Sequence, residues 1–149
     1  MKVEEIKAEG ALYFENIVDG CRHYQHEMIE MNAKQAENRF MEMWKKQECK
    51  NAYVDFYYFT LEEEAKEKVS GVLTAEELEY LKVLEKERVE SGEDSKDIIF
   101  PFNEQLIKIV VKLNESGMLF STFYFTGTDR STWWGNYNME YWVFYEAEE

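Results

Sequence analysis

The alternation of apolar and polar positions predicts that aromatic-rich strands form the end of the chain. Between Leu119 and Tyr145, two aromatic runs are separated by a polar segment that contains two glycines. Aromatic residues favour strands, whereas glycine and short polar residues favour turns. We therefore predict an antiparallel pair of strands at about 119–126 and 139–146, joined by a connection at 127–138.

Three earlier segments also have the pattern of strands: about 11–18, 52–59 and 98–100. Residues 11–18 lie between Gly10 and Gly20, and their side chains would alternate between two faces, which favours a strand. The spacing of Phe14, Ile17 and Cys21 also fits a helix. The segment 52–59 is apolar on both faces apart from Asp55, which favours a strand that is covered on both sides.

Two amphipathic helices are predicted to cover these strands, at about 21–47 and 104–115. Apolar residues recur at helical spacing in both, and the register of the first slips near Asn32, where a break is an open alternative. Asn103 is a suitable N-cap for the second helix, and Gly117 is suited to end it.

The segment 60–97 reads as an acidic helical insertion, with helices within about 61–90. Two capping boxes, Thr60 with Glu63 and Thr74 with Glu77, mark two helix starts. The segment holds thirteen acidic and six basic residues, which is half of the net charge of the whole chain.

These elements predict an α+β fold for residues 1–149 as a single domain. The sheet is expected to be antiparallel or mixed, with four or five strands and helices against one face. A length of 149 residues is typical of one domain with a sizeable core. If 52–59 or 139–146 lies at a sheet edge, a homodimer through that edge is a further expectation.

The net charge of −14 narrows the classes of partner. It disfavours ordinary nucleic-acid binding and docking on anionic membranes, because both require Lys and Arg. A basic protein surface or a cationic small molecule remains compatible with it. The simpler interpretation is that the charge keeps an aromatic-rich domain soluble.

The N-terminal residues lack the apolar region of a signal peptide, and no apolar run is long enough to span a bilayer. Two cysteines are too few for a disulfide framework. We therefore expect a cytoplasmic location and no cofactor.

Motifs for catalysis or metal binding are weak. If residues 21–47 are helical, His23 and His26 share a face to which Glu30 could add a carboxylate, but no established zinc motif is present. Nucleophile elbows, phosphate-binding loops and dinucleotide motifs are absent from the sequence. An enzyme would have to rely on carboxylates.

The connection 127–138 and the start of the last strand contain the candidate binding residues. Adjacent Trp residues in a strand point to opposite faces, so one of the pair at 133–134 is expected to be less buried. Trp, Tyr and Arg are common anchors of protein interfaces, and an acid among aromatic rings suits an organic cation. The candidate residues are Asp129, Arg130, Trp133, Trp134, Asn136, Tyr137 and Glu140.

The leading functional hypothesis is a small, acidic, non-catalytic protein that binds a protein partner, as an inhibitor or antagonist of a basic surface. The second is a sensor or carrier with an aromatic and acidic pocket for a cationic or planar small molecule. The third is a small carboxylate-based enzyme.

Overall fold

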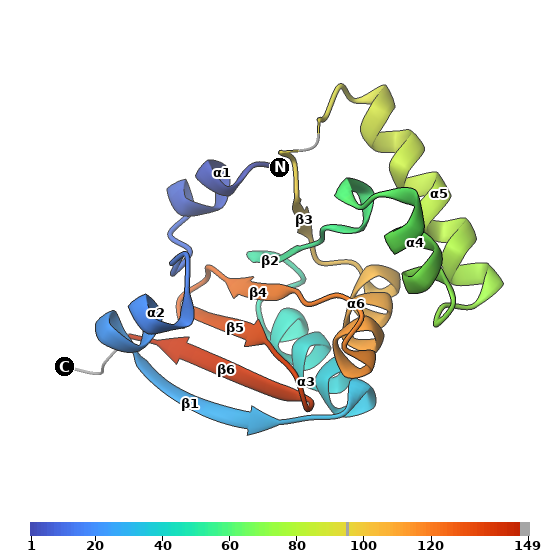
Figure 1. The fold of residues 1–149 in the computed structure, drawn as a ribbon. Coiled ribbons are helices and arrows are strands. Elements are labelled where there is room, and N and C mark those ends of the chain that lie inside the picture. Colours follow the sequence, from blue (N-terminus) through green and yellow to red (C-terminus); the bar gives the residue numbers. More distant parts are fainter. Residues whose placement is uncertain (95, 147–149) are drawn as a thin grey trace.

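The computed structural model describes residues 1–94 and 96–146 and shows helices packed around one open sheet (Figure 1). In chain order the elements are α1 (Val3–Ala8), α2 (Ile17–His23), β1 (Gln25–Glu30), α3 (Ala33–Lys46), β2 (Ala52–Asp55), the short 3-10 helix η1 (Tyr58–Thr60), α4 (Glu63–Ser70), α5 (Ala75–Glu90), β3 (Ile99–Pro101), α6 (Glu104–Ser116), β4 (Thr122–Phe125), β5 (Ser131–Gly135) and β6 (Glu140–Tyr145). None of the helices in the described part of the chain combines the length and the apolar character needed to cross a bilayer.

The sheet has six strands in the order β1-β6-β5-β4-β2-β3, and every neighbouring pair is antiparallel. The α+β class is confirmed, whereas the expected number of four or five strands is too low. The edge strands are β1 and β3. The expectation that 52–59 or 139–146 could form an edge is therefore wrong, because β2 and β6 each have a neighbour on both sides.

Helices α3 and α6 lie against one face of the sheet, which we call the α3–α6 face (Figure 1). Phe123, Trp133 and Tyr141 point from three neighbouring strands toward this face and are buried there. Phe40 of α3 stacks on Phe123 with ring centroids 4.1 Å apart. The expected covering role of the helix at 104–115 is confirmed, because α6 contributes six core residues, Leu106, Ile107, Ile109, Val110, Val111 and Leu113.

Residues 1–24 cover part of the opposite face, which we call the N-terminal face. Ile6 of α1 packs with Tyr124 and Ile99 in a second, smaller core. Gly20 of α2 lies so close to Phe14 and Phe144 that an added Cβ would fall 2.7 and 2.8 Å from their rings. The sheet is therefore covered on both faces, and not on one as the sequence suggested.

The expected strand at 11–18 is not present. Residues 11–14 form neither strand nor helix and lie on the N-terminal face, where the Thr132 hydroxyl donates to the Leu12 carbonyl at 2.6 Å. Helix α2 then begins after Asn16, whose side chain accepts the Asp19 N–H at 2.9 Å. The alternation reflects a segment that has one side against the sheet and the other toward solvent. The competing helical spacing reflects helix α2.

The long helix expected at 21–47 is also wrong, because α2, strand β1 and helix α3 occupy this range. The break lies at Asn32, where the slip in register was visible. The Asn32 side chain accepts the Gln35 N–H at 2.8 Å, and the Gln35 side chain accepts the Asn32 N–H at 2.9 Å. This capping box starts α3 and leaves residues 25–30 free to pair with β6.

Two strand boundaries and the connection 127–138 also differ from expectation. The segment 52–59 is a strand only to Asp55, after which η1 begins. The connection contains β5, which pairs with both β4 and β6. Its turn into β6 uses Asn138 and Met139, which both have positive φ near 60°. The outer strands of this region, expected at 119–126 and 139–146, are β4 and β6 with shorter bounds.

Helices α4 and α5 follow β2 and form the acidic segment between the paired strands β2 and β3 (Figure 1). The capping box of Thr74 and Glu77 is confirmed at the start of α5. The first box is wrong, because α4 starts two residues later than expected, with Glu62 at its N-cap. Lys112 of α6 ties α5 to the core through an ion pair with Glu77 at 2.7 Å.

The remaining boundaries are close to expectation. The strand expected at 98–100 is β3, and α6 begins after Asn103, whose side chain accepts the Gln105 N–H at 2.9 Å. Gly117 ends α6 in the left-handed conformation with φ of 72°.

Candidate functional site

A cavity of about 240 Å³ opens on the N-terminal face of the sheet, beside the ends of β2 and β4. It is formed by residues from the N-terminal segment, from the end of β2 and just after it, from just before β3, from β4 and the residues before it, and from the end of β5. Its lining is Val3, Tyr13, Phe14, Glu15, Asp55, Tyr57, Ile98, Phe120, Ser121, Thr122, Tyr124, Trp134 and Gly135. We call it the Asp55 pocket.

Asp55 occupies a position at which the regular pairing of two strands stops. The register of β2 and β4 pairs Val54 with Phe123, so Asp55 and Thr122 would be the next pair. Instead, the Asp55 Oδ1 atom accepts the Thr122 N–H at 2.7 Å. The carboxyl therefore replaces a backbone acceptor at the end of the ladder and holds β4 at the wall of the pocket.

The Asp55 carboxyl is almost completely buried, with 6% of the residue exposed. Burial raises its pKa from 3.8 to about 7, because a charged carboxylate loses hydration in the interior. Hydrogen bonds from Thr122 and Tyr57 oppose this effect. A group with such a pKa exchanges its proton near neutral pH and is a typical functional candidate.

Three tyrosines and a tryptophan surround this carboxyl. Burial raises the pKa of Tyr57, and the charge of Asp55 raises it further. Burial also raises the pKa of Tyr13 and of Tyr124, so all three hydroxyls stay protonated near neutral pH. Trp134 stacks on Phe14 with ring centroids 5.4 Å apart and planes 10° apart, which fixes one aromatic wall.

The lining of the pocket is acidic and aromatic. Asp55 lies buried and Glu15 is exposed, while none of the described lining residues is Lys, Arg or His. The ammonium group of Lys7 lies 4.4 Å from the ring centroid of Tyr13, so this ring of the pocket lining already contacts a cation. Such an arrangement attracts positive charge through both carboxylates and ring faces.

The structure separates the two adjacent tryptophans of the predicted binding segment. Trp133 is only 3% exposed and packs on the α3–α6 face, edge-on to Phe40 at 5.4 Å. Trp134 is half-buried on the other face and lines the Asp55 pocket. Of the seven residues predicted for binding, Trp134 is the one that lines this pocket.

The other predicted residues lie at separate places around the sheet. Arg130 donates to the Gly10 carbonyl at 2.9 Å and pairs with Glu146. Asn136, half-buried, follows β5, and Tyr137 is 65% exposed beside Phe120, with ring centroids 4.7 Å apart. Glu140 starts β6 opposite Glu30.

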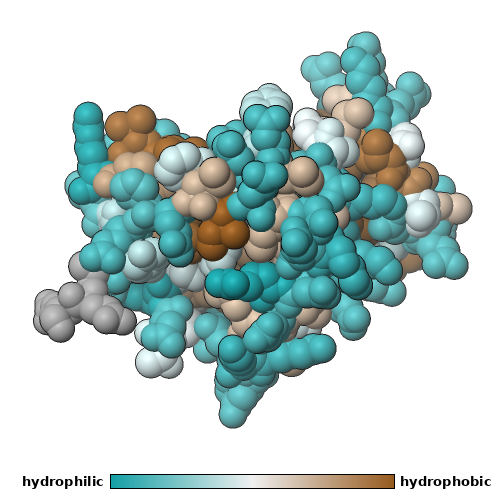
Figure 2. All heavy atoms as spheres, turned by 90° about the horizontal axis from the view of Figure 1, so that it is seen from below, coloured by the Kyte–Doolittle hydropathy of each residue, from teal (hydrophilic) through white to brown (hydrophobic). Residues whose placement is uncertain are grey.

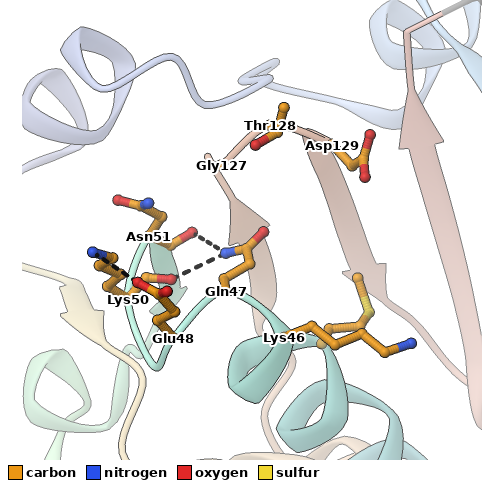
Figure 3. A pocket seen from close by; sticks show the side chains of 9 residues that line it. Lys46, Gln47, Glu48, Lys50, Asn51, Gly127, Thr128 and Asp129 are labelled. Carbon is orange, nitrogen blue, oxygen red and sulfur yellow. Dashed lines mark hydrogen bonds and ion pairs between the residues drawn. The ribbon is translucent and has the colours of Figure 1, made fainter.

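Asp129 lines a second cavity, of about 420 Å³, between the loop after α3 and the turn between β4 and β5 (Figure 3). Gln47 lies at its centre, and its Nε2 atom donates to the carbonyls of Lys50 and Asn51, both at 3.0 Å. Lys50 pairs with Glu48 at 3.3 Å. Gln47 is half-buried, the other polar residues named here are exposed, and they are largely satisfied by one another, so the Asp55 pocket is the stronger candidate site.

The weak metal cluster does not have the geometry that the sequence suggested. His23 ends α2, whereas His26 and Glu30 lie in β1, so the two histidines do not share a helix face. Within residues 1–94 and 96–146, no three His, Cys, Asp or Glu side chains are grouped so that they could hold a metal ion.

Sequence reasoning missed Asp55 as a site residue, although it stood out as the one polar residue in an aromatic strand. Tyr13, Tyr57 and Tyr124 gave no comparable signal, because aromatic residues are frequent throughout the chain. Comparison with protein-family models, curated proteins and solved structures finds no match for this chain.

Proposed function

We propose that this protein binds a small organic cation in the Asp55 pocket, as a sensor or carrier. The observation that carries the proposal is a buried carboxyl at a cavity whose other lining residues are aromatic, apolar, polar or acidic, without a basic side chain among those described. The proposal corresponds to the small-molecule hypothesis drawn from the sequence, with Asp55 in place of Glu140 as the acidic anchor.

The physical argument rests on the cost of the buried charge. A carboxylate with no cationic partner in the interior is unfavourable, and this raises the pKa of Asp55 to about 7. A ligand cation would supply the missing partner and would keep Asp55 ionised. The ring of Trp134 adds cation–π attraction, so a ligand with a flat ring and a protonated nitrogen suits the cavity.

Calorimetric titration with three ligands of similar shape tests the proposal. Benzylammonium carries a positive charge, benzyl alcohol is neutral and benzoate is negative. At pH 8, where Asp55 is mostly ionised, we expect binding in the order benzylammonium, benzyl alcohol, benzoate. Asp55→Asn keeps the acceptor for Thr122 N–H but removes the charge, and we expect it to weaken benzylammonium binding about tenfold or more.

Asp129→Asn is the matched control, because it removes an acid from the second cavity and should leave binding unchanged. Trp134→Leu should weaken binding through loss of a ring face. Equal affinity for benzylammonium and benzyl alcohol would contradict the proposal. So would unchanged binding of benzylammonium by a folded Asp55→Asn protein.

The protein-partner hypothesis stays a prediction that rests on a different surface. Helices α4 and α5 present most of the acidic side chains of 60–97, and Val83 and Val89 of α5 are exposed among them. Replacing several of these acidic residues with basic ones would abolish binding to a basic partner but should leave ligand binding in the Asp55 pocket unaffected.

A further inference from the structure

Strand β1 forms one end of the sheet and has a paired neighbour only on its β6 side. Five of its six residues are exposed, and Ile29 is half-buried. Figure 2 views the molecule from below the orientation of Figure 1, the side on which β1 lies, and shows several separate hydrophobic areas within a mostly hydrophilic surface. No described element pairs with the outer side of β1.

The opposite edge of the same sheet is closed in two ways. Strand β3 is three residues long and ends in Pro101, which cannot donate a backbone hydrogen bond. The backbone of Met1 also pairs with Ile99: the Ile99 N–H donates to the Met1 carbonyl at 3.0 Å, and the Met1 amino group donates to the Ile99 carbonyl at 2.9 Å. Strand β1 is twice as long and contains neither Pro nor Lys, although it carries the two charged residues Glu27 and Glu30.

The hydrogen-bond pattern identifies the free backbone groups of β1. The Met31 N–H donates to the Met139 carbonyl at 2.9 Å, so Met31 directs its backbone toward β6. Because the direction alternates along an antiparallel strand, Glu27 and Ile29 also face β6. His26, Met28 and Glu30 therefore direct their N–H and C=O groups away from the sheet.

We propose that two copies of this chain associate by antiparallel pairing of their β1 strands about a two-fold axis, with Met28 opposite Met28 of the second copy. The pairing continues the sheet across both molecules. It is independent of ligand binding in the Asp55 pocket, which lies beside β2, β4 and β5.

The proposed register follows from backbone groups and side chains together. With Met28 at the two-fold axis, His26 of each copy lies opposite Glu30 of the other copy. The three residues with free backbone groups then form three hydrogen-bonded pairs, with about six hydrogen bonds in total. A register centred on Glu27 instead places two identical carboxylates directly opposite each other, which is destabilising.

The side chains at the centre of this pairing suit a second copy. Met28 is 44% exposed on the same face as its cross-strand neighbour Trp142. His26 lies beside Trp142, with ring centroids 6.1 Å apart. Two methionines would meet at the axis, flanked on each side by a His–Glu pair. The charge of −14 on each copy opposes association, so added salt should strengthen the dimer.

Sedimentation velocity over a range of protein concentrations tests the proposal. We expect a monomer–dimer equilibrium for the wild-type chain. Met28→Lys places two like charges opposite each other and should raise the dissociation constant about tenfold or more. Val83→Lys is the matched control, since Val83 on α5 has a similar exposure of 48% and should leave the constant unchanged.

A charge exchange tests the register. His26→Glu places a glutamate opposite Glu30 of the second copy and should weaken the dimer. Adding Glu30→Lys to it recreates an opposite-charge pair and should restore association. Circular dichroism checks that each variant folds. We expect all of them to fold, because the substituted side chains of β1 are exposed.

Disulfide formation gives a second, independent measurement. In a chain with Cys21→Ser and Cys49→Ser, Met28→Cys should form a covalent dimer rapidly on mild oxidation, whereas Val18→Cys should not. A wild-type chain that stays monomeric, or a Met28→Lys chain that dimerises as the wild type does, would overturn the proposal. Failure of the charge exchange to restore association would overturn the register.

Discussion

Asp55 shows how one residue acquires its properties from the residues around it. Its carboxyl accepts the Thr122 N–H where the β2–β4 ladder ends, and burial raises its pKa to about 7. The same side chain therefore stabilises the end of a strand and leaves a titratable group at a cavity. In an exposed position, an Asp at the end of a strand would have neither effect.

The raised pKa of Asp55 makes a prediction about stability and pH. The folded state holds a proton on Asp55 between about pH 4 and 7, whereas the unfolded state has released it, so the free energy of unfolding falls as pH rises through this range. Asp55→Asn removes this dependence. A pKa of about 7 against 3.8 corresponds to at most about 4 kcal/mol.

Urea denaturation at pH 5 and pH 8 measures this effect. We expect Asp55→Asn to be more stable relative to the wild type at pH 8 than at pH 5, by about 1 to 3 kcal/mol. Asp129→Asn, at an exposed carboxyl, should show no such difference between the two pH values. An Asp55→Asn protein whose relative stability is the same at both would contradict the burial argument.

At the scale of elements, local capping signals marked the ends of α5 and α6 correctly, but the one at Thr60 did not mark the start of α4. Thr74 and Asn103 start α5 and α6, and Gly117 ends α6, as their residue types suggest. Asn32 is the instructive case. It was visible as a slip in helical register, yet the six residues 25–30 also fit helical spacing closely enough to hide β1.

Asn32→Ala tests how strongly this boundary depends on the cap. The substitution removes the acceptor for the Gln35 N–H at the start of α3, and we expect it to lower the free energy of unfolding by about 1 kcal/mol. Asn32→Asp keeps an acceptor and should be nearly neutral. Lys34→Ala changes an exposed residue in the same turn and controls for helix propensity. If Lys34→Ala lowered the free energy of unfolding as much as Asn32→Ala does, this would argue against a capping effect.

At the scale of the whole molecule, Phe40 links α3 to the middle of the sheet. Its ring stacks on Phe123 at 4.1 Å and meets Trp133 and Tyr141 edge-on at 5.4 and 5.6 Å. These three residues come from β4, β5 and β6. The packing of one helix residue therefore depends on three strands that adjoin one another only in the folded sheet.

Phe40→Ala should be among the most destabilising single substitutions in the chain. We expect a loss of about 3 to 5 kcal/mol, because the change removes a buried ring and leaves a cavity. Thermal unfolding followed by circular dichroism measures it. Tyr137→Ala removes a ring that is 65% exposed and should cost far less, so similar losses for the two would be inconsistent with this core.

The sequence by itself determined the α+β class, the acidic helical segment after β2, the caps of α5 and α6, and the approximate positions of four strands. These features depend on residues close together in the chain, where propensity, capping and periodicity act directly. The alternation of side chains along a strand likewise placed Trp133 and Trp134 on opposite faces.

Only the tertiary structure decided which extended segments enter the sheet. Residues 131–135 find backbone partners on two sides and form β5, whereas residues 11–14, which the sequence pattern also favoured as a strand, pack on the face of the sheet. The Asp55 pocket depends on Tyr13, Asp55 and Trp134 coming together across the chain. Burial and pKa belong to that assembled environment, so no local pattern in the sequence could reveal them.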